Sequence, residues 1–284
     1  MNSSWTTRRV IAFAHQGGSF EGPSSTLDAI EGALAHGATA LELDVHATKD
    51  RRLVVCHDES IDATTDHHGD IAQMTLAQLR EMDNAYWWKA GVGVTRDGRD
   101  VEYVHRAKAP ANRDFGIATL EEVARRVPGV LLNLDIKQTS PGVEPYEDLL
   151  ADELRLLEIT DSVIVASFHD SAIERFRFLA PEVATSGATG ETSAFYFSLV
   201  EGTPHVPPVC AFQVPAYFGE VTVVDERFVE VAHQHGLAVH VWTINDVDEM
   251  GRLLDLGVDG IISDTPTPLA TLLRARDCAW DGVL

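Results

Sequence analysis

Residues 40–57, Ala40-Leu-Glu-Leu-Asp-Val-His-Ala-Thr-Lys-Asp-Arg-Arg-Leu-Val-Val-Cys-His57, hold two strand-like apolar runs separated by a short polar link. Two parallel strands need a crossover of about a dozen or more residues between them. The link at residues 48–52 is too short for such a crossover. The strands Ala40–Val45 and Leu53–His57 are therefore predicted to form an antiparallel hairpin.

Seven other short β-branched runs alternate with helical patterns, which is typical of βα units and a mostly parallel sheet. They are Val10–Ala14, Val130–Ile136, Ser162–Ala166, Glu182–Ser186, Val209–Val214, Ala238–Thr243 and Gly260–Ser263. Once Leu53–His57 is set aside as the added hairpin strand, eight parallel strands remain. We therefore predict an α/β fold, a (β/α)8 TIM barrel.

The segments between these strands are predicted to form helices and one insertion. Helices are expected at Ser25–His36, Thr75–Met82, Thr119–Val127, Tyr146–Leu157, Asp170–Leu179, Asp225–His235, Val247–Leu256 and Pro268–Ala275. Residues 84–116 follow neither the strand nor the helix period and are too long for an ordinary connection, so they are predicted to be an insertion. Because no linker divides the chain, residues 1–284 are predicted to form a single domain.

Composition limits the partners of the chain. The formal net charge of −22 disfavours binding to nucleic acid or to anionic membrane surfaces. No apolar run reaches the roughly 20 residues that span a bilayer, and no signal peptide is recognised. The three cysteines are far apart and form no pair motif, so a reducing, cytoplasmic location is expected. The oligomeric state is left open.

Polar side chains interrupt the apolar pattern of residues 40–57. Because strand side chains alternate, Glu42 and Asp44 share one face of their strand. If the hairpin turn is centred at residues 50–51, Asp44 lies directly opposite His57. Two acids on one strand face are typical of an oxygen-rich cation site.

Two other predicted strands also carry polar groups at their C-terminal ends. The first strand runs into His15 and a pair of glycines, which are expected to let a substrate or a water approach the backbone. Further along, alternation places Asn133, Asp135 and Lys137 on one face. Barrel active sites are built at the C-terminal ends of the strands. Since several uncompensated buried charges would be costly to retain, this co-occurrence predicts a functional site.

Seven motifs, in order over nearly the whole chain, resemble the glycerophosphodiester phosphodiesterase family. They are His15-Gln-Gly-Gly, Glu42-Leu-Asp-Val-His-Ala-Thr-Lys-Asp, Val54-Val-Cys-His-Asp58, Leu132-Asn-Leu-Asp-Ile-Lys137, Ser167-Phe168, Trp242-Thr-Ile-Asn245 and Gly257-Val-Asp-Gly-Ile-Ile-Ser-Asp-Thr-Pro266. The resemblance implies a barrel related to phosphatidylinositol-specific phospholipase C. It also implies hydrolysis of glycerophosphodiesters to glycerol 3-phosphate and an alcohol, a step of lipid and glycerol metabolism.

The resemblance also implies roles for individual residues. One divalent cation, Mg²⁺ or Ca²⁺ with Mn²⁺ as an alternative, would be held by Glu42, Asp44 and Asp135. His15 and His57 would act as general acid and base. The residues expected to contact the small-molecule phosphodiester substrate are Gln16, Glu21, Lys137, Phe168 and Trp242.

The chain departs from the family pattern at three positions. Gln16 stands where the family usually has Arg, Ser24 where it usually has Glu, and Asp135 where it usually has the longer Glu. Glu21 is a candidate to replace the acid that is missing at position 24. These changes affect the expected strength of phosphate and cation binding more than the expected class of reaction.

Two other functions stay open. One is a lysophospholipase D that acts on lysophospholipids, with the aromatic residues of 86–88 and 195–197 sheltering the acyl chain. The other is a catalytically weak, ligand-binding barrel. For the phosphodiesterase itself, attack by the neighbouring glycerol hydroxyl through a cyclic phosphate and direct attack by water are both compatible with the residues.

Overall fold

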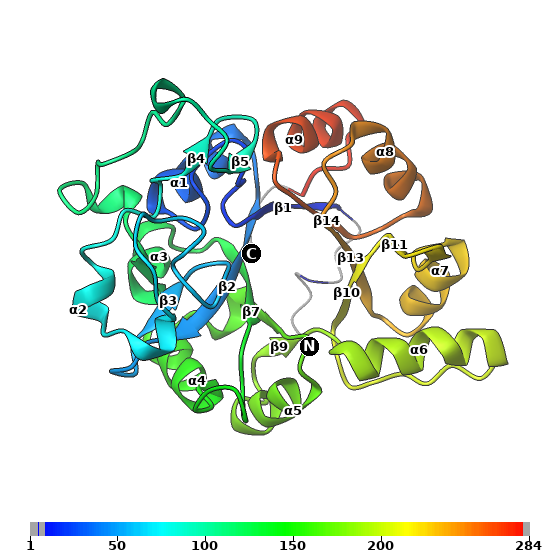
Figure 1. The fold of residues 1–284 in the computed structure, drawn as a ribbon. Coiled ribbons are helices and arrows are strands. Elements are labelled where there is room, and N and C mark those ends of the chain that lie inside the picture. Colours follow the sequence, from blue (N-terminus) through cyan, green and yellow to red (C-terminus); the bar gives the residue numbers. More distant parts are fainter. Residues whose placement is uncertain (1–4, 6–8, 281–284) are drawn as a thin grey trace.

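The computed structural model describes Trp5 and residues 9–280, which contain a barrel of eight parallel strands (Figure 1). The strands are β1 (Ile11–His15), β2 (Ala40–Ala47), β7 (Leu131–Ile136), β8 (Val163–Ala166), β9 (Ala184–Thr185), β10 (Ala211–Pro215), β13 (Ala238–Trp242) and β14 (Gly260–Ser263). Their order in the sheet is β10-β13-β14-β1-β2-β7-β8-β9, and a parallel bridge between Ser186 and Ala211 connects the two end strands. The predicted (β/α)8 barrel is confirmed. The prediction that all of residues 1–284 form one domain extends beyond the described residues.

Helices surround the barrel (Figure 1). They are α1 (Leu27–His36), α2 (Leu76–Leu79), α3 (Leu120–Arg126), α4 (Glu147–Leu156), α5 (Asp170–Leu179), α6 (Thr189–Glu201), α7 (Glu226–Gln234), α8 (Val247–Leu256) and α9 (Pro266–Ala275). Single turns of 3₁₀-helix lie at Ile71–Gln73, Asp100–Glu102, Arg113–Phe115 and Thr160–Ser162. Among the described residues, no helix has both the length and the apolar character needed to span a membrane.

Helix α6 is absent from the sequence prediction. Its sequence is rich in aromatic and hydroxyl residues with low helix propensity and contains Gly190, so it lacks a clear apolar period. Tertiary packing supplies the missing stability, because Phe195 is fully buried against the rings of Phe212 and Phe228. Gly190 also donates its backbone N–H to Asp170, which ties the start of α6 to α5.

The predicted hairpin forms, but its predicted register is wrong by one residue. Strand β3 (Leu53–Val55) pairs antiparallel with the end of β2, and the facing residues include Val45 with Val55 and His46 with Val54. The turn has three residues rather than two, and the last of them, Arg51, has a left-handed φ of 59°. Asp44 therefore does not lie opposite His57, which follows the end of β3.

The interior of the barrel changes character along the strands. At the N-terminal end it is filled by apolar side chains, including Ile11, Phe13 and Leu131, with Trp5 stacked on Phe13. The same inward alternation then brings polar residues toward the C-terminal ends. The apolar core therefore fills the N-terminal end of the barrel, and the polar cluster lies toward its C-terminal end.

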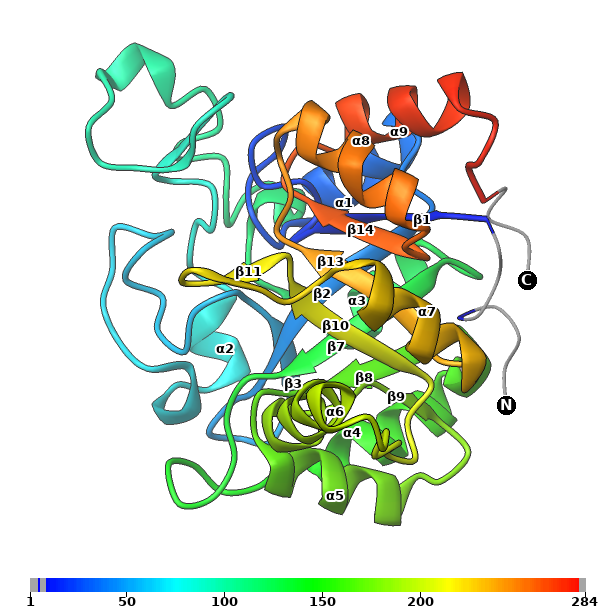
Figure 2. The same ribbon diagram turned by 90° about the vertical axis from the view of Figure 1, so that its right-hand side faces the viewer.

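The predicted insertion at residues 84–116 leaves the barrel between α2 and the short strand β6 (Ala118–Thr119), which pairs with β3. It contains a small hairpin of β4 (Trp88–Lys89) and β5 (Gly93–Val94). Asn84 closes its base through a backbone hydrogen bond to Phe115. Figure 2 shows the segment at the same end of the barrel as α2 and a hairpin of β11 (Tyr217–Phe218) and β12 (Val221–Thr222).

Candidate active site

A row of inward-facing residues begins at the C-terminal end of β1 and crosses the neighbouring strands β2 and β7. His15 on β1 is the register partner of Glu42 on β2, and Glu42 is the register partner of Asn133 on β7. Two residues further along both strands, Asp44 on β2 is the register partner of Asp135 on β7. The alternation predicted from the sequence therefore brings the three predicted cation ligands together.

These acids are buried and incompletely paired. Oxygens Glu42 Oε2, Asp44 Oδ2 and Asp135 Oδ1 are buried and have no hydrogen-bond partner. Buried polar atoms are nearly always satisfied in native proteins, and carboxylate oxygens are the ligands that Mg²⁺ and Ca²⁺ prefer. The residues therefore fit a hard divalent cation. No three acidic, histidine or cysteine side chains among the described residues are already close enough to hold a metal ion as they stand.

Lys137 lies beside the acids, as its alternation with Asp135 predicts. Its ammonium nitrogen is 3.1 Å from Asp44 Oδ1 and 3.7 Å from Asp135 Oδ2. Burial alone would lower the pKa of Lys137, but the carboxylates of Asp44 and Asp135 outweigh burial and raise it. The lysine is therefore a fixed positive charge at the C-terminal end of β7.

The acids repel one another. Burial, followed by the charges of Asp44 and Asp135, raises the pKa of Glu42 well above its usual range. Burial and the charge of Asp44 likewise raise the pKa of Asp135 to about 7. Lys137 alone does not offset this repulsion, so the cluster favours the arrival of further positive charge.

Burial and repulsion of the acids together predict how the free energy of unfolding of the metal-free protein depends on pH. Folded Asp135 holds its proton up to about pH 7, whereas the unfolded residue loses it near 3.8, so metal-free protein should lose stability as pH rises between these values. We expect Asp135→Asn to gain thermal stability relative to the chelated wild type at about pH 8, and much less at about pH 4. Thermal unfolding at both pH values measures this. A difference that is the same at both values would contradict the raised pKa.

His15 is oriented by the carboxylate of Asp264, which directly follows the last strand, β14. Its Nδ1 lies 2.7 Å from Asp264 Oδ1, and the same carboxylate accepts hydrogen bonds from the Ser19 hydroxyl and from the Asn245 side-chain amide. Burial would raise the pKa of Asp264, but the hydrogen bond from His15, its charge and these donors keep it below the usual range. A His15 Nδ1–H held by Asp264 leaves Nε2 for proton transfer.

His57 is the second imidazole of the site. Its ring lies at 89° to that of His15, with 6.0 Å between the ring centroids. Nδ1 of His57 is 2.7 Å from Asp58 Oδ1, and this hydrogen bond is the main reason that the pKa of His57 is raised. The two predicted catalytic histidines are therefore neighbours, although the predicted hairpin register that placed His57 was wrong.

Gln16 contacts His15 rather than open space. Its side-chain nitrogen is 3.1 Å from His15 Nε2, and its amide oxygen accepts a 2.5 Å hydrogen bond from Ser24. Two of the three residues at which the chain departs from the expected family pattern, Gln16 and Ser24, are thus hydrogen-bonded to each other. Gln16 itself has a left-handed φ of 54° and is buried.

The glycines that follow have a different role from the one expected. Gly17 and Gly18 both have a left-handed φ, and a Cβ on Gly18 would lie 2.8 Å from the ring of Pro266. A Cβ on Gly17 would lie 3.1 Å from the backbone nitrogen of Ile30. The glycines therefore allow a sharp turn packed against α1 and α9. The space they leave is filled by protein.

Of the other residues predicted to contact substrate, Phe168 and Trp242 lie together at strand ends, whereas Glu21 is bound to α9. Phe168, after β8, is 57% exposed and forms an edge-to-face contact with Trp242 at the end of β13. Glu21 instead binds the start of α9, where its carboxylate accepts hydrogen bonds from the backbone and hydroxyl of Thr267. Its contacts therefore give no support to the idea that it replaces an acid beside His15.

Three residues support the two histidines, although the sequence alone predicts no role for them. Asp264 and Asn245 lie in the quoted motifs, and Asp58 directly follows His57. Asp264 is 249 residues from His15, so no local period relates them. The only signal in the sequence was the position of Asp264 at the end of the last strand.

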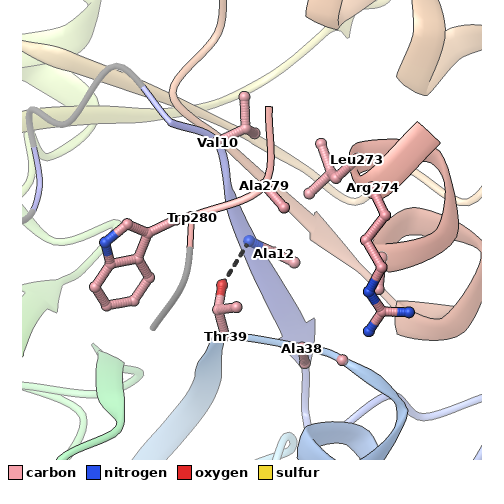
Figure 3. A pocket seen from close by; sticks show the side chains of 10 residues that line it. Val10, Ala12, Ala38, Thr39, Leu273, Arg274, Ala279 and Trp280 are labelled. Atoms are coloured by element: carbon pink, nitrogen blue, oxygen red, sulfur yellow. Dashed lines mark hydrogen bonds between the residues drawn. The ribbon is translucent and has the colours of Figure 1, made fainter. Parts of the chain in front are cut away.

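A cavity at the other end of the barrel is separate from this site (Figure 3). It is lined by residues at the start of β1, the link before β2, and α9, including Val10, Thr39 and Arg274. Within it, the hydroxyl of Thr39 accepts a hydrogen bond from the backbone of Ala12. Since the polar cluster lies at the C-terminal ends of the strands, this cavity is remote from the histidines.

Both the sequence and the fold of the chain are similar to those of known proteins. A model of the glycerophosphoryl diester phosphodiesterase family matches residues 15–267. The chain belongs to this family. Its members are phosphoric diester hydrolases, and the chain is an enzyme of that class.

Individual glycerophosphodiester phosphodiesterases match over most of the chain. The enzyme of Caldanaerobacter subterraneus subsp. tengcongensis is 29% identical over 269 residues, which cover 94% of this chain and 98% of the relative. A probable glycerophosphodiester phosphodiesterase 2 of Mycobacterium tuberculosis is 29% identical over 279 residues, covering 96% and 93%. The family assignment thus extends over nearly the whole length of both relatives.

Solved structures support the fold. A putative glycerophosphoryl diester phosphodiesterase from Silicibacter pomeroyi has a TM-score of 0.76 at 22% identity, covering 99% of this chain and 100% of that one. A phosphodiesterase from Oleispira antarctica, in complex with the product sn-glycerol-3-phosphate, has a TM-score of 0.70 at 22% identity, covering 94% and 97%. These structures have the same barrel architecture as this chain.

Proposed function

We propose that the protein hydrolyses glycerophosphodiesters to glycerol 3-phosphate and an alcohol, with one divalent cation and with His15 and His57 as proton-transfer groups. The observation that carries the proposal is the neighbouring pair of imidazoles beside three buried carboxylates with unpartnered oxygens. The product complex of the Oleispira antarctica relative supports the choice of product. Mg²⁺ or Ca²⁺ is the expected cation, because all the proposed ligands are oxygens.

Charge at the site fits a phosphodiester. The substrate carries one negative charge and gains more on its oxygens in the transition state. A cation held by Glu42, Asp44 and Asp135 would supply positive charge to those oxygens. Lys137 adds a second positive charge from the chain itself. A strongly acidic protein can in this way bind an anionic substrate locally.

The two histidines are suited to different steps of proton transfer. The raised pKa of His57 supports a protonated imidazole near neutral pH, which would donate a proton to the departing alcohol. His15, with Nδ1 held by Asp264, would accept the proton of the attacking hydroxyl at Nε2. To do so it must exchange the Gln16 amide for that hydroxyl. The attacking group is the neighbouring glycerol hydroxyl, giving a cyclic phosphate that water then opens, or alternatively water directly.

Lys137 provides a test of phosphate binding. Lys137→Met keeps the length of the side chain and removes its charge, so we expect affinity for sn-glycerol 3-phosphate to fall by about tenfold or more, on the scale of a lost charge-assisted hydrogen bond. Isothermal titration calorimetry measures this affinity without a chemical step. Lys137→Arg is the matched control that keeps the charge. If Lys137→Met binds the product as well as the wild type does, Lys137 has only a structural role.

A lysophospholipase D is the second candidate, favoured by exposed aromatic residues at the mouth of the barrel. Phe168 is 57% exposed, and Phe218 of the β11–β12 hairpin is 77% exposed. Most of the aromatic residues that the sequence offers for the acyl chain, at 86–88 and 195–197, make contacts within the protein instead. Arg106 lies over the rings of Tyr86 and Trp87, and Phe195 is buried in the core.

Product analysis separates these functions. We expect the protein, supplied with Mg²⁺ or Ca²⁺, to release glycerol 3-phosphate and choline from glycerophosphocholine. Faster release of choline from lysophosphatidylcholine, lost in a Phe168→Ala, Phe218→Ala double variant, would instead indicate a lysophospholipase D. No product from either substrate with any of Mg²⁺, Ca²⁺ or Mn²⁺ would favour the ligand-binding barrel.

The cytoplasm is the proposed compartment. Cys56, Cys210 and Cys278 are all free thiols. Free cysteines without a disulfide framework are typical of proteins in a reducing compartment.

A further inference from the structure

Asn133 is a buried amide that the proposed function does not use. It lies on β7 between two apolar neighbours and is 2% exposed. Its side-chain oxygen Oδ1 is buried and has no hydrogen-bond partner. Buried amide oxygens without a partner are rare in native proteins, so this atom requires an explanation.

The position of Asn133 relates it to the acids. Its register partner on β2 is Glu42, and Asp135 lies two residues further along on the same inward face. The oxygens Glu42 Oε2 and Asp135 Oδ1 are also buried and unpartnered. Four unpartnered oxygens, including that of Asp44, therefore come from two adjacent strands, at two successive inward-facing register pairs.

We propose that Asn133 Oδ1 is a further direct ligand of the divalent cation, in addition to Glu42, Asp44 and Asp135. This inference rests on the proposed metal dependence. Mg²⁺ takes about six oxygen ligands and Ca²⁺ about six to eight, so three carboxylates leave room for more. A neutral amide oxygen fills one position without adding a further negative charge to the three acids.

Asn133→Leu tests the proposal, because leucine is similar in size and has no polar atom. We expect its affinity for Ca²⁺, measured by isothermal titration calorimetry, to fall about tenfold or more. Eu³⁺, a hard cation that also seeks oxygen ligands, then reports the contacts. Its luminescence lifetimes in H₂O and D₂O give the number of bound waters, and we expect one more in Asn133→Leu than in the wild type.

Gln213→Leu is the matched control. Gln213 is an inward amide on β10, on the other side of the barrel, where its nitrogen contacts His240. This variant loses a barrel amide of the same kind, yet we expect unchanged Ca²⁺ affinity and an unchanged number of Eu³⁺-bound waters. The comparison separates loss of a ligand from general loosening of the barrel.

The outcomes distinguish this inference from the proposed function. If Asn133→Leu binds Eu³⁺ with the same number of waters as the wild type, Asn133 supports the acids without touching the cation, and the inference is overturned. If the wild type binds no cation at all, metal dependence fails as well. Should Asn133→Leu not fold, anomalous scattering from Mn²⁺ in wild-type crystals decides, with Asn133 Oδ1 expected about 2.2 Å from the metal and a separation beyond about 3.5 Å contradicting the inference.

Discussion

His15→Ala and His57→Ala are each expected to lower turnover by a factor on the order of 10² or more. The reason is that each substitution removes a group that transfers a proton, whereas the acids on β2 and β7 stay in place. Cation affinity should therefore remain close to that of the wild type. Turnover of glycerophosphocholine and calorimetric titration with Ca²⁺, made on the same preparations, give the two quantities.

The surroundings of the histidines provide the controls. His68→Ala removes an imidazole that is 70% exposed and paired with Asp62, and should leave turnover unchanged. Asp264→Asn keeps the size of the side chain that holds His15 but removes its charge, so it should lower turnover while His15 is still present. If His15→Ala or His57→Ala instead loses cation affinity in proportion to turnover, that histidine is a ligand or a support of the cation site.

Glu42→Ala, Asp44→Ala and Asp135→Ala are expected to weaken cation binding by about 100-fold or more. Each removes a charged oxygen, and the effect should reach or exceed the 10- to 100-fold typical of residues that only support the ligands. Turnover should be lost at cation concentrations that saturate the wild type. Calorimetric titration with Ca²⁺ and Mg²⁺ measures the affinity directly.

The same acid variants should also change the stability of the metal-free protein. Because Glu42 and Asp135 have raised pKa values from burial and mutual repulsion, removing one acid should stabilise the metal-free protein while it weakens the metal-bound form. Asp259→Asn changes a buried acid before β14 that is paired with His233, and should leave cation affinity unchanged. Acid variants that bind Ca²⁺ like the wild type would show that these carboxylates are not its ligands.

Much of the fold follows from local rules that do not depend on exact pairing. Alternation with a period of two places Glu42 with Asp44 and Asn133 with Asp135 regardless of where each strand begins. The capping residues Thr75 and Thr119 likewise mark the starts of α2 and α3, and both capping boxes are present.

The features that sequence reasoning missed depend on conformation or on distant partners. The hairpin register depended on whether Arg51 adopts a left-handed conformation, which the sequence alone does not reveal. Helix α6 is stabilised by burial of Phe195 rather than by helix propensity. The contact of Asp264 with His15 arises only when the last strand closes beside the first.

Cation-dependent release of sn-glycerol 3-phosphate from glycerophosphocholine tests the proposed metal-dependent hydrolysis most directly. The protein is first freed of metal by chelation and then supplied with Mg²⁺, Ca²⁺ or Mn²⁺ in turn. We expect no glycerol 3-phosphate from the chelated protein and rapid release once an effective cation is added. Equal release before and after addition of the cation, with the chelated protein verified to be metal-free, would contradict the proposed metal dependence.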